Sequence, residues 1–196
     1  MQHEIHRQTP FWLQHFEDIV TSGIPFYTER WKSSNIDPLQ IKKIVQLGPG
    51  VGTDTAIFLT LFPNASMHLI DIYDDLHISV KSNPRVTFCQ GKFVEILERQ
   101  QMGFYDLTIL RFIGSKHGFN EKTAGLLQKT VGTGYLLTDG DNGLLESQSW
   151  FRTRFNEITA LDINISLWKT LTKPTLDEVE NGRTVIAQNI LYLSIV

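Results

Sequence analysis

Three glycines and one aspartate have the spacing that most clearly predicts a ligand site. Gly48, Gly50 and Gly52 follow a short apolar run at 43–47 and precede a helical pattern at 53–62, which Thr53 is placed to cap. Glycines let the backbone turn sharply and approach a ligand, and a helix points its first N–H groups toward the same place. Asp71 closes the next apolar run, where a carboxylate can accept hydrogen bonds from ribose hydroxyls.

The spacing of the glycines narrows the choice of ligand. The dinucleotide fingerprint is G-x-G-x-x-G, whereas this chain reads G-x-G-x-G and has Thr53 at the sixth position. The phosphate-binding pattern that ends in Gly-Lys-Ser/Thr is absent from the sequence as well. The loop therefore matches neither of these two phosphate-binding patterns.

Short apolar runs alternate with helical patterns after residue 43, and this predicts a parallel sheet covered on both faces. The expected strands are 43–47, 67–72, 85–90, 106–113 and 134–138, and the expected helices are 53–62, 76–81, 93–101 and 120–131. A helical face at 144–158 precedes two β-rich runs at 163–171 and 184–196, which are expected to pair antiparallel. The predicted fold is α/β: a doubly wound, seven-stranded, mostly parallel sheet with an antiparallel last strand, in a Rossmann-like three-layer α/β/α arrangement.

The first forty residues have a different texture. Aromatic residues recur at helical spacing on both sides of Gly23-Ile24-Pro25, which predicts two short helices separated by a break. Residues 1–40 are therefore expected to form an N-terminal helical lid or appendage. Residues 41–196 are expected to form one cofactor-binding domain.

Composition limits the function classes. The 196 residues carry a formal net charge of −3, so no summed positive field would draw the chain to nucleic acid or an anionic membrane. Cys89 is the single cysteine, which excludes an intrachain disulfide and a cysteine-based metal cluster. The sequence shows neither a signal peptide nor a run long enough to cross a membrane, so we expect a cytoplasmic protein.

The sequence strand-L-G-x-G-x-G-T, followed by an acid that closes the next strand, resembles the class I S-adenosylmethionine-dependent methyltransferases. The resemblance extends over residues 43–196 and includes the antiparallel pair at the end of the sheet. It implies that S-adenosylmethionine is the cofactor and that a methyl group passes in line to a small-molecule acceptor. A homodimer is compatible with this family.

The resemblance also implies roles for individual residues. Gly48, Gly50 and Gly52 would lie under the methionine part and ribose of the cofactor, and Asp71 would bind the ribose hydroxyls. Around the adenine, the positions that match the family's contacts are Ile72, Lys92 and Phe93. At the methionine end they are Gln46 and Arg111, where Arg111 could pair with the carboxylate.

Two of these positions depart from the family pattern. Lys92 stands where an aspartate often binds the adenine amino group, and a lysine cannot accept a hydrogen bond. Gln46 stands where an acid is usual, although its amide can still accept one.

The candidates for the chemistry follow the fourth and fifth predicted strands. His117 is the expected general base if the acceptor is a hydroxyl. Asp139 and Asp141 follow the fifth predicted strand, and Asp141-Asn142 looks like the metal-binding pair of catechol-type enzymes, but Arg111 stands where that site has a further acid. No metal is therefore expected, and the two aspartates would hold a polar substrate. Tyr27 and Trp31 are expected to face the substrate from the N-terminal lid.

Other functions remain open on the sequence. Gln46 and Lys92 are compatible with a methyltransferase-like binding or scaffold protein that has lost activity. An aminopropyltransferase-like enzyme or an NAD(P)-dependent oxidoreductase could use the same scaffold. The former would need an acidic motif after the fourth strand, and the latter a glycine at the sixth loop position.

Overall fold

The computed structural model describes residues 10, 12–32, 34, 36–100, 104–110, 121–131, 134–139, 158–161 and 191–195. Its first long element is α2 (Phe16–Lys32), followed by a short 3-10 turn η1 (Pro38–Gln40). Then β1 (Lys43–Leu47), α3 (Thr53–Leu61), β2 (Ser66–Asp71), α4 (Ile78–Lys81), β3 (Val86–Gln90) and α5 (Phe93–Leu97) alternate along the chain. The remaining elements are β4 (Leu107–Leu110), α6 (Glu121–Val131), β5 (Tyr135–Asp139), β6 (Ile158–Leu161) and β7 (Leu191–Ile195).

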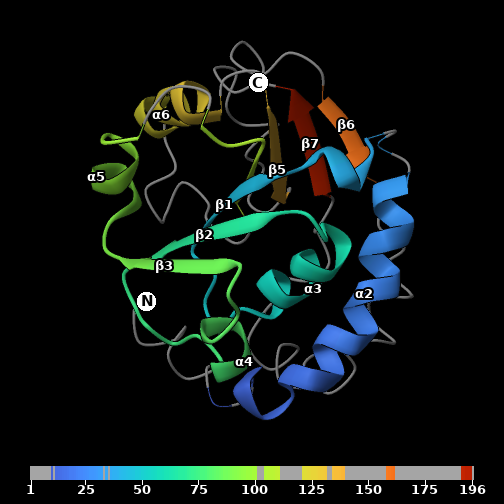
Figure 1. Cartoon of the computed structure of the whole chain (residues 1–196). Helices are drawn as coiled ribbons and strands as arrows, with labels where there is room; N and C mark the ends of the chain where they lie inside the picture. The colour runs from blue at the N-terminus through green and yellow to red at the C-terminus, as the bar shows by residue number, and fades with distance from the viewer. Residues whose placement is uncertain are drawn as a thin grey trace, which may run out of the picture.

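One sheet organises these elements (Figure 1). Within the described residues it has seven strands in the order β3-β2-β1-β4-β5-β7-β6. The first five strands pair in parallel, and β7 runs antiparallel between β5 and β6. The Rossmann-like α/β fold predicted from the sequence is therefore confirmed.

The structure has a strand that the sequence did not predict. This strand, β6, occupies Ile158–Leu161 and includes the last residue of the helix expected at 144–158, while the strand expected at 163–171 lies outside the described residues. Residues 144–157 and 162–190 lie outside the described part of the chain. The run ITAL has no strict alternation of apolar and polar residues, so its pairing with β7 was not visible from the local sequence.

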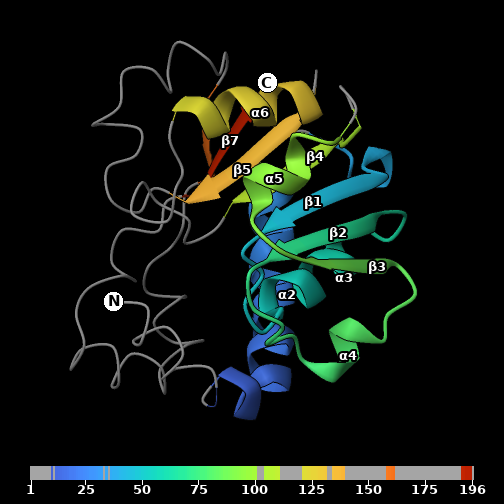
Figure 2. The ribbon, with the colours of Figure 1, turned by 90° about the vertical axis from the view of Figure 1, so that its left-hand side faces the viewer.

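The direction of the connections decides which helix covers which face. From β1 to β2 the chain moves one way across the sheet, and from β4 to β5 it moves the other way. Because such connections are right-handed, α3 and α6 must lie on opposite faces, with α5 beside α6. Figure 2 shows this arrangement, with α5 and α6 in front of the strands and α2 and α3 behind them.

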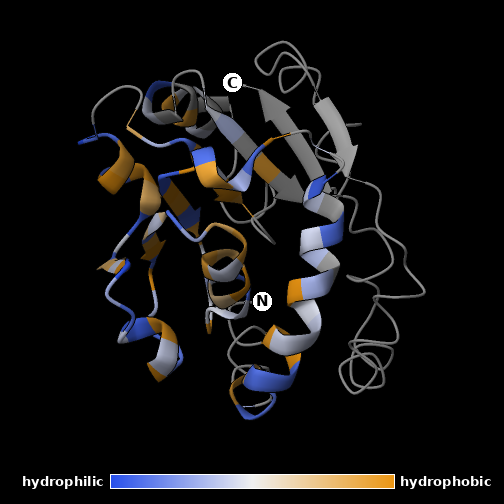
Figure 3. Cartoon of the chain, turned by 45° about the vertical axis from the view of Figure 1, so that its right-hand side comes forward, coloured by the Kyte–Doolittle hydropathy of each residue, from blue (hydrophilic) through white to orange (hydrophobic). Residues whose placement is uncertain are grey.

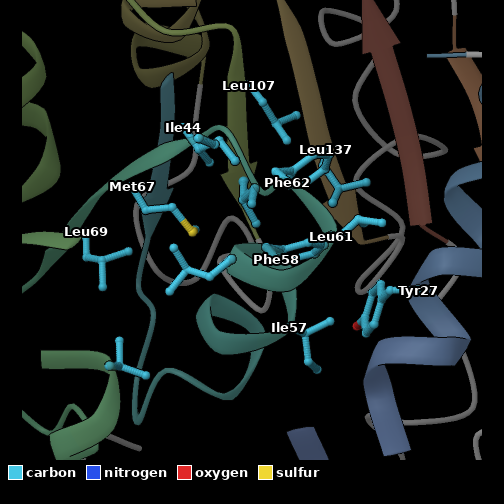
Figure 4. Packing of buried hydrophobic residues seen from close by; sticks show 14 of the residues in the cluster. Tyr27, Ile44, Ile57, Phe58, Leu61, Phe62, Met67, Leu69, Leu107 and Leu137 are labelled. Atoms are coloured by element: carbon cyan, nitrogen blue, oxygen red, sulfur yellow. The ribbon is translucent and has the colours of Figure 1, made fainter. Parts of the chain in front are cut away.

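The core on the α3 side is apolar and rich in aromatic rings. Helix α3 is apolar on nearly every side, because the sheet covers one side of it and α2 another; Figure 3 contrasts it with the mixed colours of α2. Figure 4 shows Tyr27 of α2 beside this helix. The Tyr27 and Phe58 rings meet edge-on at 5.2 Å, and those of Trp31 and Phe62 at 4.8 Å.

Helix α2 is continuous, so the prediction of two helices with a break at Gly23-Ile24-Pro25 is wrong. A Cβ on Gly23 would come within 2.4 Å of Ile57 Cδ1, so the glycine allows close contact between α2 and α3. Pro25 is exposed, where water can replace the backbone hydrogen bond that proline removes. Packing of α2 on α3 thus overrides the helix break that Gly23-Ile24-Pro25 predicts.

No helix of the described residues is both long and apolar enough to span a membrane.

Arg85 holds the end of α3 in place, and this gives a stability prediction. Its guanidinium donates to four carbonyls at 2.8–3.3 Å, those of Leu59, Phe62, Pro63 and Ala65. We expect Arg85→Met to lower the free energy of unfolding by about 2–3 kcal/mol, because these carbonyls lose a charged donor. Chemical denaturation measures the change.

The matched control is Arg99→Met at an exposed position after α5. This variant should stay within about 0.5 kcal/mol of the wild type. Equal losses at Arg85 and Arg99 would contradict the role given to Arg85.

Candidate functional site

The loop after β1 has the backbone that its glycines predict. Gly48, Gly50 and Gly52 have φ values of +65°, +55° and +87°, all in the left-handed region. The Gly48 N–H donates to the Ile70 carbonyl at 2.9 Å, which ties the loop to the end of β2. The loop thus lies at the carboxyl end of β1, beside β4, where the strand order changes direction. Ligands of open α/β sheets bind at such a point.

Gly50 and Gly52 are glycines for different reasons. In the described part of the chain, a Cβ on Gly50 would meet no atom within 4 Å. A Cβ on Gly52 would instead lie 3.1 Å from both Leu76 Cδ2 and Val80 Cγ2. Gly50 therefore borders open space, whereas Gly52 is buried against the segment after β2.

Helix α3 begins directly behind this loop. Its N-cap is Gly52, not Thr53 as the sequence predicted, and no side chain caps the helix at that position. The reason is geometric, because only glycine adopts the left-handed φ of +87° at this point without strain.

Asp71 lies at the same edge and contacts the loop directly. Its Oδ2 accepts a hydrogen bond from the Gly50 N–H at 3.2 Å, and its Oδ1 accepts one from the Tyr73 N–H at 3.2 Å. Burial is the main cause that raises the pKa of the Asp71 carboxyl, and nearby Asp75 adds to it, while backbone N–H groups offset part of the effect. The structure thus brings together the loop and the acid that the sequence singled out.

The residues expected around an adenine ring are partly exposed. Ile72 follows Asp71 and is 46% exposed, which is high for an isoleucine. Phe93 is the first residue of α5 and is half-buried. The Lys92 side chain is 76% exposed and lies 3.6 Å from Glu95, so its ammonium group has a carboxylate partner within its own helix end.

Gln46 occupies a different setting from the one expected. Its side chain is 1% exposed, and its Oε1 accepts a hydrogen bond from Thr55 Oγ1 at 2.8 Å. Thr55, on α3, is fully buried and was not singled out by the sequence analysis. No local signal set Thr55 apart, because the preceding residues Thr53 and Asp54 are polar as well; only its burial shows that its hydroxyl needs a partner.

Tyr27 and Trp31 were expected to face a substrate, and their burial contradicts this. Each is 3% exposed and belongs to the core between α2 and α3. Trp31 also donates its indole N–H to the Ile36 carbonyl at 2.9 Å. Trp31 packs on Phe62, which follows the last turn of α3. The glycine loop precedes the first turn of α3, so Trp31 lies at the opposite end of this helix from the loop. These two aromatic residues stabilise the fold.

Several expected residues cannot be placed. Arg111, His117 and Asp141 lie outside the described residues. Asp139 is the last residue of β5, where its backbone pairs with Leu191 of β7. Across the ranges that are described, no group of three or more His, Cys, Asp or Glu side chains is arranged to hold a metal ion.

Comparison with known proteins identifies the fold. No protein-family model matches the sequence, and no curated protein matches it. Among solved structures, the StiE O-MT domain aligns with 85% of this chain and 72% of its own, at 12% identity and a TM-score of 0.57. The plantazolicin methyltransferase BpumL in complex with S-adenosylhomocysteine aligns with 98% of this chain and 89% of its own, at 12% identity and a TM-score of 0.50.

A Haemonchus contortus phosphoethanolamine N-methyltransferase, in complex with its phosphomonomethylethanolamine ligand and S-adenosylhomocysteine, aligns with 84% of this chain and 51% of its own. Its identity is 10% and its TM-score 0.52. The chain therefore has the fold of the class I S-adenosylmethionine-dependent methyltransferases.

The two glycines can be separated by stability measurements. Gly50→Ala should cost about 1–2 kcal/mol of unfolding free energy, because only the left-handed φ is strained. Gly52→Ala carries the same strain plus overlap with Leu76 and Val80, so it should cost about 3–5 kcal/mol. Denaturant titration of both variants is the measurement, and equal losses would contradict the different surroundings assigned to them.

Proposed function

We propose that this protein is an S-adenosylmethionine-dependent methyltransferase that transfers a methyl group in line to a small-molecule acceptor. The observation that carries the proposal is the open space beside Gly50, in a left-handed loop joined to Asp71 at the edge where the strand order reverses. A loop of this shape has backbone N–H groups beside a carboxylate, and nothing in the described residues fills the space. Nucleosides need this combination of a close backbone approach and an acceptor for the ribose.

The described residues fit the cofactor. Asp71 would accept hydrogen bonds from the two ribose hydroxyls, and the missing side chain of Gly50 leaves room for the ribose itself. The exposed Ile72 and the half-buried Phe93 offer apolar surface to the adenine ring. Gly48 would lie under the methionine part, and Gly52 would act through the shape of the loop.

Gln46 and Lys92 would take part less directly than the resemblance implies. The Gln46 carbonyl oxygen already accepts from Thr55, so the amide would present its NH₂ group and donate rather than accept. Lys92 faces solvent beside Glu95, and its backbone, at the N-cap of α5, would be the part nearest to the adenine.

The remaining roles fall on Asp139, at the end of β5, and on residues outside the described part. Arg111 would pair with the carboxylate of the methionine part. His117 would take the proton from a hydroxyl acceptor, and Asp139 and Asp141 would orient a polar substrate. We also place the protein in the cytoplasm, with no nucleic-acid, membrane or metal partner and with a homodimer as an acceptable state, because the composition favours this setting.

In this proposal the protein aligns the acceptor with the methyl group of the cofactor and excludes water from the site. The cofactor, when bound, supplies an electrophilic methyl group on a sulfonium. Asp71 and the glycine loop would fix the nucleoside, and this fixes the line along which an acceptor must approach. The N-terminal end of α2 lies toward the loop, because Gly23, Tyr27 and Trp31 contact Ile57, Phe58 and Phe62 in the same chain order. Tyr27 and Trp31, which are buried further along α2, would therefore take no part in covering the site.

Calorimetry with S-adenosylhomocysteine tests the proposal. We expect binding by the wild-type protein and about 10- to 100-fold weaker binding by Asp71→Ala, because bonds to a charged acceptor contribute roughly 1.5–3 kcal/mol. A concentration of about 500 μM ligand is high enough to detect a Kd close to the millimolar range. Absence of wild-type binding at this concentration would overturn the cofactor assignment. Unchanged affinity in Asp71→Ala would remove Asp71 from the site.

The affinity should also depend on pH. The ionised Asp71 is the better acceptor, and burial raises the pKa of this carboxyl. Affinity for S-adenosylhomocysteine should therefore weaken as the pH falls through that raised pKa, beginning at a higher pH than for an exposed aspartate. Calorimetry between about pH 4 and pH 8 covers the window.

The matched control for the pH series is Asp71→Asn, which cannot titrate and should show a flatter profile. Parallel profiles for the wild type and Asp71→Asn would mean that another group sets the pH dependence.

A cofactor-binding protein without transferase activity is the second candidate. The hydrogen bond of Gln46 with Thr55 and the 1% exposure of Gln46 favour it, because this buried amide oxygen has one of its two acceptor positions occupied and carries no charge to bind the cofactor's amino group. Binding of S-adenosylhomocysteine without methyl transfer to a broad acceptor panel would support this second function.

A further inference from the structure

The glycine loop is held from behind by residues 76–80. The His77 N–H donates to the Val51 carbonyl at 2.9 Å, at the crest of the loop. Leu76 and Val80 lie 3.1 Å from the place where a Gly52 side chain would begin. The position of residues 76–80 therefore sets the position of Val51 and Gly52.

Residues 76–80 cannot fix their own position. Helix α4 has four residues, and a helix this short is not stable by its own hydrogen bonds. Leu76 and Val80 are 8% and 1% exposed, so they attach the segment to the core from one side. The ring of His77 is a further attachment.

The His77 ring has two partners. Its Nδ1 lies 2.8 Å from Ser79 Oγ and accepts from the Ser79 N–H at 3.4 Å, which caps α4. Its flat face stacks on Phe16, with ring centroids 4.0 Å apart and an interplanar angle of 14°. Phe16 is 2% exposed and is the first residue of α2.

A continuous chain of contacts thus runs from the N-terminal helix to the ligand loop. Phe16 stacks on His77, and the backbone of His77 holds the Val51 carbonyl. Figures 1 and 2 both show α4 beside the N-terminal end of α2. The far end of α2, at Trp31, contacts the opposite end of α3 and has no part in this chain.

We propose that His77 is a positioning residue that couples the N-terminal end of α2 to the cofactor loop through its stack on Phe16. This inference rests on the proposed function and adds a control point to the same site. Loosening the stack lets α4 shift, and the loop that seats the nucleoside shifts with it. The N-terminal segment thereby sets cofactor affinity without touching the cofactor.

Two variants break the stack while sparing other interactions. His77→Asn removes the ring but keeps a short side-chain acceptor, and asparagine is a favoured helix cap. Phe16→Leu keeps an apolar side chain in the buried position but lacks a flat face. We expect each to weaken binding of S-adenosylhomocysteine about 5- to 20-fold, within the usual range of coupling between sites. The double variant should bind S-adenosylhomocysteine no more weakly than the single variant with the lower affinity, because both substitutions remove the same contact.

The matched control is Trp31→Leu, in the same helix and equally buried. It should lower the melting temperature at least as much as His77→Asn, yet keep the affinity for S-adenosylhomocysteine within about twofold of the wild type. Wild-type affinity in both His77→Asn and Phe16→Leu would overturn the proposal. An equal loss of affinity in Trp31→Leu would also overturn it, because the effect would then be one of general stability.

Hydrogen exchange of the ligand-free protein gives a readout that does not depend on the cofactor. His77→Asn and Phe16→Leu should speed exchange of the Gly50 and Gly52 amides, which donate to Asp71 and Pro49. Trp31→Leu should leave these amides unchanged. If the wild type binds no S-adenosylhomocysteine, the proposed function fails, but the exchange measurement still tests the coupling. Unchanged exchange in both His77→Asn and Phe16→Leu would refute the coupling between α2 and the glycine loop.

Discussion

The handedness of the connections between parallel strands is the constraint on which the rest of this structure depends. Because each connection is right-handed, a chain that moves from β1 to β2 in one direction and from β4 to β5 in the other must place α3 and α6 on opposite faces. The strand order therefore reverses between β1 and β4, which is the point where open α/β sheets leave an opening for a ligand. The glycine loop follows β1, so its place at this opening follows from the strand order.

The loop is fixed by backbone and side-chain contacts from the last two residues of β2 and from His77, which precedes α4. Ile70 accepts from Gly48, Asp71 accepts from Gly50, and His77 donates to Val51. The loop is thereby held on the side of β2 and α4, and its space beside Gly50 stays free in the described structure. The same contacts make Asp71 a support of the loop, and in the proposed function it is also the acceptor for the ribose hydroxyls. A ligand that binds Asp71 thus also affects the loop.

Local sequence predicted the fold well where a single element determines the outcome. The apolar runs at 43–47, 67–72 and 85–90 became strands, and the glycines at 48, 50 and 52 took left-handed φ values. The break at Gly23-Ile24-Pro25 was predicted wrongly because a glycine signal reports backbone freedom and not the neighbour that requires it. In this protein the neighbour is Ile57, which leaves no room for a side chain.

The sequence by itself determined the alternation of elements, the turn after β1 and the acid at the end of β2. These depend on the chemistry of neighbouring residues along the chain. The tertiary structure alone decided that Tyr27 and Trp31 are core residues, that Gln46 bonds Thr55, and that Phe16 meets His77. Each of these facts joins segments that are distant in sequence. The order and handedness of the strands bring them together, and no local pattern of residues encodes that order.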